Sequence, residues 1–436
     1  MRAAAPQAAS AAPGAVTTYA WYVLGLLLVV NVVNYVDRQI LAILLPDIRA
    51  EFSASDLALG ALQPAFHWTY VIAGLVVARL AERGVRRSIL AAGLAGWSLM
   101  TGLSGFAQNV LQLTLARAGV GAGEAAAQPT AAPIVSDYFP ASRRTTAFSV
   151  LGIGVHLGIL VGFVIGGVVA ERFGWRNAFL LVGLPGLALA ALVRLTLREP
   201  ERGAADGIRV SAETPPFAAV VRFVWQTRSL RWLALGAATA TLGGAALYHF
   251  GPSHVARVSG LERGAIGVSM GLATAIGGLA GTLLAGVVTD WLVRRDGRAY
   301  FWTSAFASAA AIPFILGFLF LSEMPRAFVS LGISVFFTSM YLGPIAALPQ
   351  TLAPPRMRAT TIVVMGLLNS AVAQALGSPL VGAVSDLLHP LQGENSLRSA
   401  LALVVSSAYA LSLLFYGFGA RHVRGDLAVA SARAFA

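Results

Sequence analysis

The sequence predicts an all-α membrane protein with twelve transmembrane helices in two pseudo-symmetric bundles of six. Apolar residues occupy 57% of the 436 positions and charged residues only 11%, too few to cover a soluble protein of this length. A crossing needs about 20 mostly apolar residues, so twelve crossings with short connections use nearly the whole chain. The expected spans are 19–46, 57–79, 88–107, 110–137, 144–170, 176–197, 229–251, 264–290, 301–321, 326–353, 359–386 and 397–419.

A repeated segment divides the chain into two halves. Residues 140–146 read PASRRTT and residues 355–361 read PRMRATT, each running from a connection into the start of the next expected span. An even number of helices in each half makes the repeat parallel, with its axis along the membrane normal. The longest polar stretch is expected to link the halves. The predicted organisation is a disordered tail at 1–18, a bundle at 19–197, a linker at 198–228, a bundle at 229–419 and a tail at 420–436.

The distribution of arginine predicts the orientation. All 31 basic residues are arginine. If both termini are cytoplasmic, 22 of these arginines lie inside, seven lie outside and two lie within spans, which satisfies the positive-inside rule. We therefore expect a multi-pass protein of the inner membrane, with both termini in the cytoplasm. The first apolar run continues into Asp37 and Arg38 without a cleavage pattern, so no signal peptide is expected.

Composition argues against several other classes of protein. The chain has no cysteine, which excludes disulfide frameworks and thiolate metal sites. A formal net charge of +12 would indicate nucleic-acid binding if it formed one soluble patch. The arginines are instead scattered among apolar stretches. The six histidines lack metal-ligand spacing, and we expect neither a metal nor a cofactor.

Charged side chains inside the first-half spans are the strongest functional signal. A charge at the centre of a spanning helix costs about 2.5–3.5 kcal/mol on insertion scales. The first span carries Asp37 and Arg38 one turn after Asn34, and the fourth carries Arg117 and Glu124. The spans of the second half have no charge near their centres. Positions 117, 121, 124 and 128 recur at helical spacing, so we expect them to share one face.

These elements resemble the Spinster family of the major facilitator superfamily. The resemblance is carried by NYVDR at 34–38 with Pro46, RAGVGAGEA at 117–125 with Pro129, GWRNAF at 174–179 and GLPG at 183–186. It covers most of the first half and is weaker in the second. It implies the major facilitator fold and transport of lysophospholipids or sphingolipid-like amphiphiles. His67 and His156 depart from the pattern, since relatives are expected to have apolar residues or proline there.

The buried charges suggest how such a transporter is energised. We interpret Asp37 and Glu124 as proton-coupling carboxylates, because a carboxylate between burial and a neighbouring arginine can change protonation as a cavity wets and dries. The alternative is that both only form ion pairs that fix helices together. Arginine suits an anionic headgroup because its guanidinium can bind it through two hydrogen bonds. The expected substrate site comprises the arginines, their polar neighbours and aromatic residues of the tenth span: Arg38, Arg117, Asn34, Gln128, Phe337 and Tyr341.

A charged motif follows the second span and is expected to form a cytoplasmic gate. Its Glu82 has a counterpart 208 positions later in Asp290. We expect a salt-bridge network between the halves that locks the outward-facing state, unless these charges serve orientation alone. Relatives have a glycine and an aspartate where this chain has Ala78 and Glu82. The predicted gate residues are Glu82, Arg83, Arg86, Arg87 and Asp290.

The function that combines these observations is proton-coupled secondary transport by alternating access. We expect a monomer in the lipid bilayer that moves protons and a small amphipathic substrate and does not bind nucleic acid. A sugar-acid type proton symporter would carry the same charges in the first and fourth spans. A multidrug exporter is a close neighbour of the lipid hypothesis. A membrane enzyme would need a nucleophile–base or metal constellation, which the sequence lacks.

Overall fold

The computed structural model describes residues 16–202, 216–354 and 357–435. All regular structure in these ranges is helical, which confirms the predicted fold class. Nine of the described stretches are long and apolar enough to cross a membrane, and one of them, 375–432, contains two successive helices. The third and fourth expected spans are helical but less apolar. The observed helices follow the twelve expected spans along the chain.

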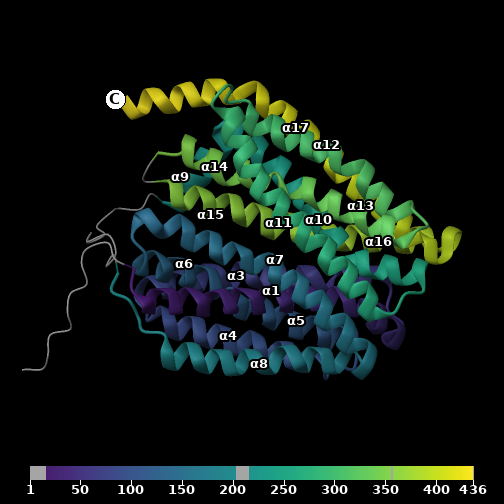
Figure 1. Ribbon diagram of the computed structural model, residues 1–436. Coiled ribbons are helices and arrows are strands. Elements are labelled where there is room, and N and C mark those ends of the chain that lie inside the picture. The colour runs from purple at the N-terminus through teal and green to yellow at the C-terminus, as the bar shows by residue number, and fades with distance from the viewer. Residues whose placement is uncertain (1–15, 203–215, 355–356, 436) are drawn as a thin grey trace, which may run out of the picture.

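The first half is a bundle in which distant segments pack in pairs. Within this half, the most extensive packing joins the first helix to the seventh and the fourth helix to the eighth. In Figure 1 this half forms the purple-to-teal layer. Its helices are α1 (Thr18–Phe52), α2 (Asp56–Gly60), α3 (Leu62–Arg83), α4 (Arg86–Ser104), α5 (Val110–Glu124), α6 (Ala127–Tyr138), α7 (Ala141–Phe173) and α8 (Trp175–Thr196).

The second half forms the green-to-yellow layer beside the first (Figure 1). It is preceded by a short helix, α9 (Phe217–Gln226), that lies within the expected linker. The last helix continues through the expected C-terminal tail. The elements are α10 (Arg228–Ser259), α11 (Arg263–Val293), α12 (Ala299–Phe320), α13 (Met324–Ser339), α14 (Leu342–Leu352), α15 (Arg358–Leu368), the π-helix η2 (Asn369–Gln374), α16 (Ala375–Gln392), the 3₁₀ turn η3 (Gly393–Asn395) and α17 (Ser396–Phe435).

Four expected spans are interrupted where the sequence suggested continuous helices. The second breaks at Ala61 between α2 and α3, the fourth between α5 and α6, and the tenth between α13 and α14. In the eleventh, the wider π-helical turn η2 joins α15 to α16. Non-standard turns in membrane helices occur where neighbouring protein or a cavity satisfies the backbone. Each break changes which side chains face the centre of the molecule.

The halves meet most closely at one end, which we call the α2 end. The opposite end, which carries α9, is the linker end. At the α2 end, α7 and α11 approach through Gly167 and Gly267. A Cβ on Gly267 would collide with the carbonyl oxygen of Phe163. Glycine is therefore required for this close contact between backbones.

Candidate functional site

A cavity of about 260 Å³ lies between the two halves. The first half contributes side chains from α1, α3, α5 and α7, and the second from α10, α13, α14, η2 and α17. Both arginines predicted for the site, Arg38 and Arg117, line this cavity. The position between repeats is where substrates bind in transporters of this architecture.

Arg38 joins the cavity wall to a buried carboxylate. Its Nε donates a hydrogen bond of 2.7 Å to Oε2 of Glu124, whose side chain has no exposed surface. The guanidinium also lies 5.2 Å from the ring centroids of Tyr35 and Tyr70 and 5.4 Å from that of Phe66. These contacts hold the guanidinium of Arg38 at the cavity wall, and Glu124 is buried on the side of Arg38 away from the cavity.

A second charged layer lies deeper in the first half. Asp37 is fully buried, and the buried side chains of Trp97 and Thr101 lie beside its carboxyl group. The nearby Arg117 is 2% exposed and donates from Nη1 to the backbone carbonyl of Asp37 at 3.3 Å. Its guanidinium lies 5.3 Å from the Phe66 ring, so Phe66 contacts both arginines. A buried ionised carboxylate without a close ion-pair partner is costly unless it takes up a proton.

The remaining predicted site residues of the first half are placed differently. Asn34 is buried in this cluster, with its side-chain amide next to the carboxyl group of Glu124. Gln128 follows the break between α5 and α6, and it is exposed and does not line the cavity. The expected common face of 117, 121, 124 and 128 therefore ends at Glu124. The extrapolation failed because it assumed an uninterrupted helix.

The wall formed by the second half is more polar than the sequence suggested. The Tyr341 hydroxyl lies 2.8 Å from Oγ1 of Thr241, and both side chains line the cavity. Further hydroxyl groups come from Tyr248, Thr338 and Tyr409. The second-half spans, which lack charged residues near their centres, therefore present neutral hydrogen-bonding groups to the cavity. The cavity wall combines two guanidinium groups with tyrosine and threonine hydroxyls.

Phe337 does not line the cavity, contrary to expectation. Its ring packs against Phe306, Phe314 and Phe336, with centroid distances of 5.2–5.9 Å. Phe306 is 62% exposed on the outside of the bundle. The helix break after Ser339 places Tyr341 towards the cavity and leaves Phe337 between α12 and α13.

Several cavity residues were not predicted as part of the site, and His249 is the most deeply buried of the histidines among them. It lies near the end of the seventh expected span and is buried between the halves, on the cavity wall. Its Nε2 lies 3.3 Å from the carbonyl oxygen of Leu59, and its Nδ1 lies 2.8 Å from Nε2 of Gln63. A carbonyl only accepts, so Nε2 carries the hydrogen and Nδ1 accepts from Gln63. His67 and His156 also line the cavity.

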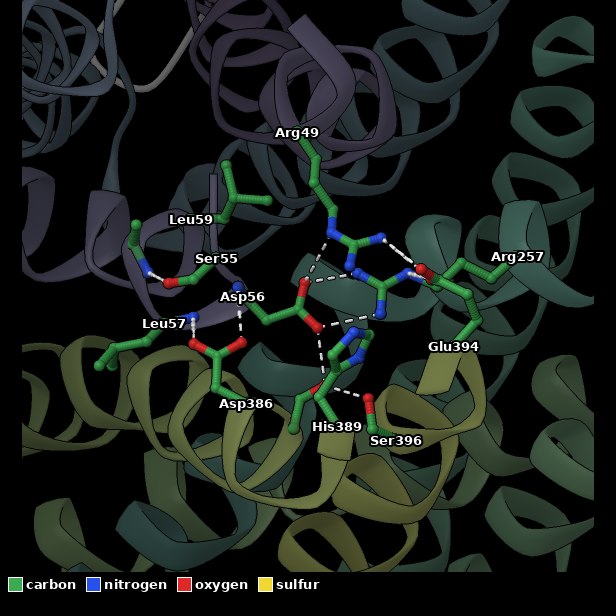
Figure 2. A network of polar contacts seen from close by, with 12 residues as sticks. Arg49, Ser55, Asp56, Leu57, Leu59, Arg257, Asp386, His389, Glu394 and Ser396 are labelled. Atoms are coloured by element: carbon green, nitrogen blue, oxygen red, sulfur yellow. Dashed lines mark hydrogen bonds and ion pairs between the residues drawn. The ribbon is translucent and has the colours of Figure 1, made fainter. Parts of the chain in front are cut away.

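An ion-pair network closes the α2 end. Asp56 at the start of α2 accepts hydrogen bonds from both terminal nitrogens of Arg257 and from the Ser385 hydroxyl. Glu394 lies 3.0 Å from Nη1 of Arg49 and 3.4 Å from Nε of Arg257. Figure 2 shows these side chains converging from α1, α2, α10, α16 and η3. The network joins the two halves on one side of the cavity.

The motif predicted as a gate makes its contacts within the first half and with the start of the linker. Arg86 is buried and bridges Asp137 at 2.6 Å and Glu199 at 2.7 Å. The backbone N–H of Arg87 donates to the Glu199 carboxylate. Glu82, Arg83 and Asp290 are exposed. Since the halves are joined at the α2 end here, a network that locks the opposite state stays a prediction.

Comparison with known proteins gives consistent matches over nearly the full length. The profile of the Major Facilitator Superfamily matches residues 27–378. An MFS-type efflux pump of Mycolicibacterium smegmatis is 32% identical over 416 residues, covering 94% of both proteins. The sphingosine-1-phosphate transporter SPNS2 of Danio rerio is 27% identical over 410 residues, covering 89% of this chain and 80% of that protein.

A solved structure is similar along almost the whole chain. It is a bacterial homologue of the human lysosomal transporter Spinster in an inward-facing and unoccupied conformation, with a TM-score of 0.85 and 25% identity. The match covers 94% of this chain and 98% of that one.

Proposed function

The chain belongs to the Major Facilitator Superfamily as a Spinster-like member, and we propose that it transports an anionic amphiphile together with protons. It is a membrane transporter and not an enzyme. The proposal is supported above all by the contact between Arg38, on the cavity wall, and Glu124, which is sealed behind it. We propose that the transporter acts as a monomer, by alternating opening of the α2 end and the linker end.

Coupling follows from the competition of two anions for one guanidinium. With Glu124 ionised, its carboxylate holds the Nε of Arg38 at 2.7 Å. Protonation of Glu124 would weaken that charge-assisted hydrogen bond and leave the guanidinium for a substrate anion. Proton binding and anion binding then favour each other, and by linkage the effect is reciprocal. Asp37 provides a second buried carboxylate beside Arg117 for the same purpose.

The cations also discriminate between substrate classes. Arg38 and Arg117 line the cavity, whereas Asp37 and Glu124 are fully buried and do not line it. A cationic drug would meet two guanidinium groups with no exposed carboxylate among the described lining residues. An anionic headgroup is therefore favoured over the cations that many multidrug exporters would need to accept. We propose a single phosphate-type headgroup, with the attached chain directed along the second half.

A small hydroxylated organic anion is the second candidate, for one specific reason. The second-half wall presents the hydroxyls of Thr241, Tyr341 and Tyr409, which can bind sugar hydroxyls that an apolar wall would reject. Both candidate substrates carry an anionic group, and they differ in the rest of the molecule, which is an acyl chain in one and a hydroxylated carbon skeleton in the other. An acyl chain gains about 0.8 kcal/mol for each buried methylene, whereas a sugar acid gains nothing from added methylenes.

Binding measurements on the purified protein test both parts of the proposal. Lysophosphatidic acids of increasing chain length and a six-carbon sugar acid would be compared at two pH values, with wild type and Glu124→Gln. We expect affinity to rise with chain length, and its rise at low pH to be smaller in Glu124→Gln, in which only Asp37 can still take up a proton. A preference for the sugar acid at every chain length would promote the second candidate. An undiminished pH dependence in Glu124→Gln would remove Glu124 from coupling.

The orientation is a proposal based on arginine distribution. We propose that the linker end faces the cytoplasm of the inner membrane, so that the α2 end is periplasmic and this conformation is inward-facing. Reporter fusions at Ala205, which lies outside the described residues, and after Ala436 should be active only as cytoplasmic reporters. Periplasmic activity at Ala205 would reverse the orientation.

A further inference from the structure

The short helix α9 has an apolar surface that the rest of the protein does not cover. Its Val220 and Val224 are buried, at 0% and 1% exposure, and pack on a cluster that includes Leu230 and Met365. Three other large apolar residues of α9 are exposed: Phe217 at 48%, Val221 at 39% and Trp225 at 49%. They are four residues apart, so they form one stripe along the helix.

The angular arrangement of α9 resembles that of an interfacial helix. At 100° for each residue, the stripe lies next to the docked face, and the two together form one continuous apolar arc. Arg222 and Gln226 are exposed on the side away from the docked valines. A helix with this pattern fits the corner between a membrane protein and the membrane surface, where its polar face meets water.

The neighbourhood of α9 places it at the level of that surface. One residue, Thr227, separates α9 from α10, which runs into the membrane bundle. Trp232, one turn into α10, stacks with Phe415 and Phe418 at centroid distances of 5.7 and 5.2 Å. Such aromatic side chains collect at the boundary between hydrocarbon and headgroups. The aromatic cluster at the start of α10 therefore indicates that α9 lies near the level of this boundary.

Positive charge accompanies the stripe. Arg222 and Arg228 are exposed, and Arg231 lies 5.5 Å from the Trp232 ring. The hydrogen bonds and ion pairs found among the described residues give Arg222 and Arg228 no acidic partner. Arginines beside a membrane surface attract anionic lipid headgroups.

We propose that α9 lies in the membrane surface at the linker end and binds anionic phospholipid. Phe217, Val221 and Trp225 enter the boundary of the acyl chains, while Arg222 and Arg228 bind phosphate groups of the lipid. The helix then fixes the start of α10 relative to the membrane. This inference rests on the exposed face of α9 and is independent of the transported substrate.

The absence of cysteine from the sequence allows a direct measurement of depth. Full-length protein carrying Val221→Cys on the stripe, or Gln226→Cys on the polar face, would be spin-labelled in nanodiscs of phosphatidylcholine and phosphatidylglycerol. We expect oxygen to relax the Val221 label strongly and a water-soluble nickel chelate to relax it weakly, with the reverse at Gln226. Equal access of nickel to both labels would mean that α9 lies in water. Protection of Val221 from both reagents would mean that protein covers the stripe. Either result overturns the proposal.

A second measurement tests the lipid chemistry. The preference of the protein for spin-labelled phosphatidylglycerol over phosphatidylcholine should fall several-fold in the double variant Arg222→Gln/Arg228→Gln, approaching about fivefold for each arginine at this site. The matched control is Arg326→Gln, which removes an exposed arginine at the α2 end that pairs with Glu323. Wild-type selectivity in the double variant, or an equal loss in the control, would contradict binding of headgroups by α9.

Discussion

Asp386 and Asp56 are acidic residues from opposite halves that lie side by side. Their carboxylates can be neighbours because each interacts with a different set of positive or hydrogen-bond-donating groups. The Asp386 carboxylate accepts from the backbone N–H groups of Asp56 and Leu57, each at 3.0 Å, and so caps the N-terminus of α2. The Asp56 carboxylate faces Arg257 and Arg49 instead. Figure 2 shows the two carboxylates on opposite sides of the helix start. Helix N-termini favour negative charge, so the repulsion between the two residues is offset.

The first prediction concerns the closed α2 end. Arg257→Gln should leave the buried Asp56 without its main charge partner, which costs about 3–5 kcal/mol for buried pairs, and should favour the conformation open at this end. Asp386→Asn should have a smaller effect, about 1 kcal/mol, because it only weakens a helix cap. Distances between spin labels at Ala50→Cys and Val258→Cys would report the opening. Equal distance distributions in wild type and Arg257→Gln would contradict the role of the network.

The second prediction concerns the contact between α7 and α11. Gly267→Ala should prevent the closest approach of the halves, because its Cβ would meet the carbonyl oxygen of Phe163. Overpacking of this kind costs about 1–3 kcal/mol. The closed conformation alone bears that cost, so the same label pair should report more opening. Gly286→Ala in the same helix is the control, since an added Cβ there meets no atom within 4 Å.

The third prediction concerns coupling. Asp37→Asn and Glu124→Gln keep nearly the same volume and should leave the protein folded, while accumulation driven by a pH gradient is lost. Glu124→Gln still offers Arg38 a carbonyl acceptor, so its loss of stability should stay near 1–3 kcal/mol. Accumulation in proteoliposomes and the midpoint of thermal unfolding would be measured together. Wild-type accumulation and pH dependence in both variants would make the carboxylates structural.

The fourth prediction compares two aromatic residues that are four positions apart. Tyr341→Ala should weaken a long-chain ligand more than a short-chain one, because Tyr341 lines the cavity. Phe337→Ala should leave this chain-length preference unchanged, because Phe337 packs between α12 and α13. Arg38→Ala should weaken long and short chains alike. Chain-length profiles measured by titration would show the difference, and a similar loss in both aromatic variants would contradict the placement of Phe337.

The sequence was sufficient to predict the helical bundle and the charged cluster. Spans could be placed from hydropathy, and charged residues stood out because the membrane makes them costly. Asp37, Arg38, Arg117 and Glu124 were recognisable for this reason, and the structure places them together in the first half.

Two site residues were misplaced. Gln128 was assigned to the Glu124 face on the assumption of regular helical spacing, and the break between α5 and α6 changes the direction of the residues beyond it. Phe337 was assigned to the cavity with Tyr341 as an aromatic residue of the tenth span, and its ring packs against α12 instead. His249 was overlooked because its importance comes from Gln63 and Leu59 in the other half. Contacts between residues about 190 positions apart leave no local pattern.

The placement of the carboxylates behind the arginines has a consequence for the energy balance of the cell. A carrier with proton-binding groups open to both sides would conduct protons without carrying substrate and would discharge the membrane potential. In this structure, the guanidinium of Arg38 lies on the cavity wall and the fully buried side chain of Glu124 lies behind it. A fixed positive charge repels hydronium ions at that point. For the proton coupling proposed above, the resting protein should therefore be a poor proton conductor, and it could be abundant in the membrane without dissipating the proton gradient.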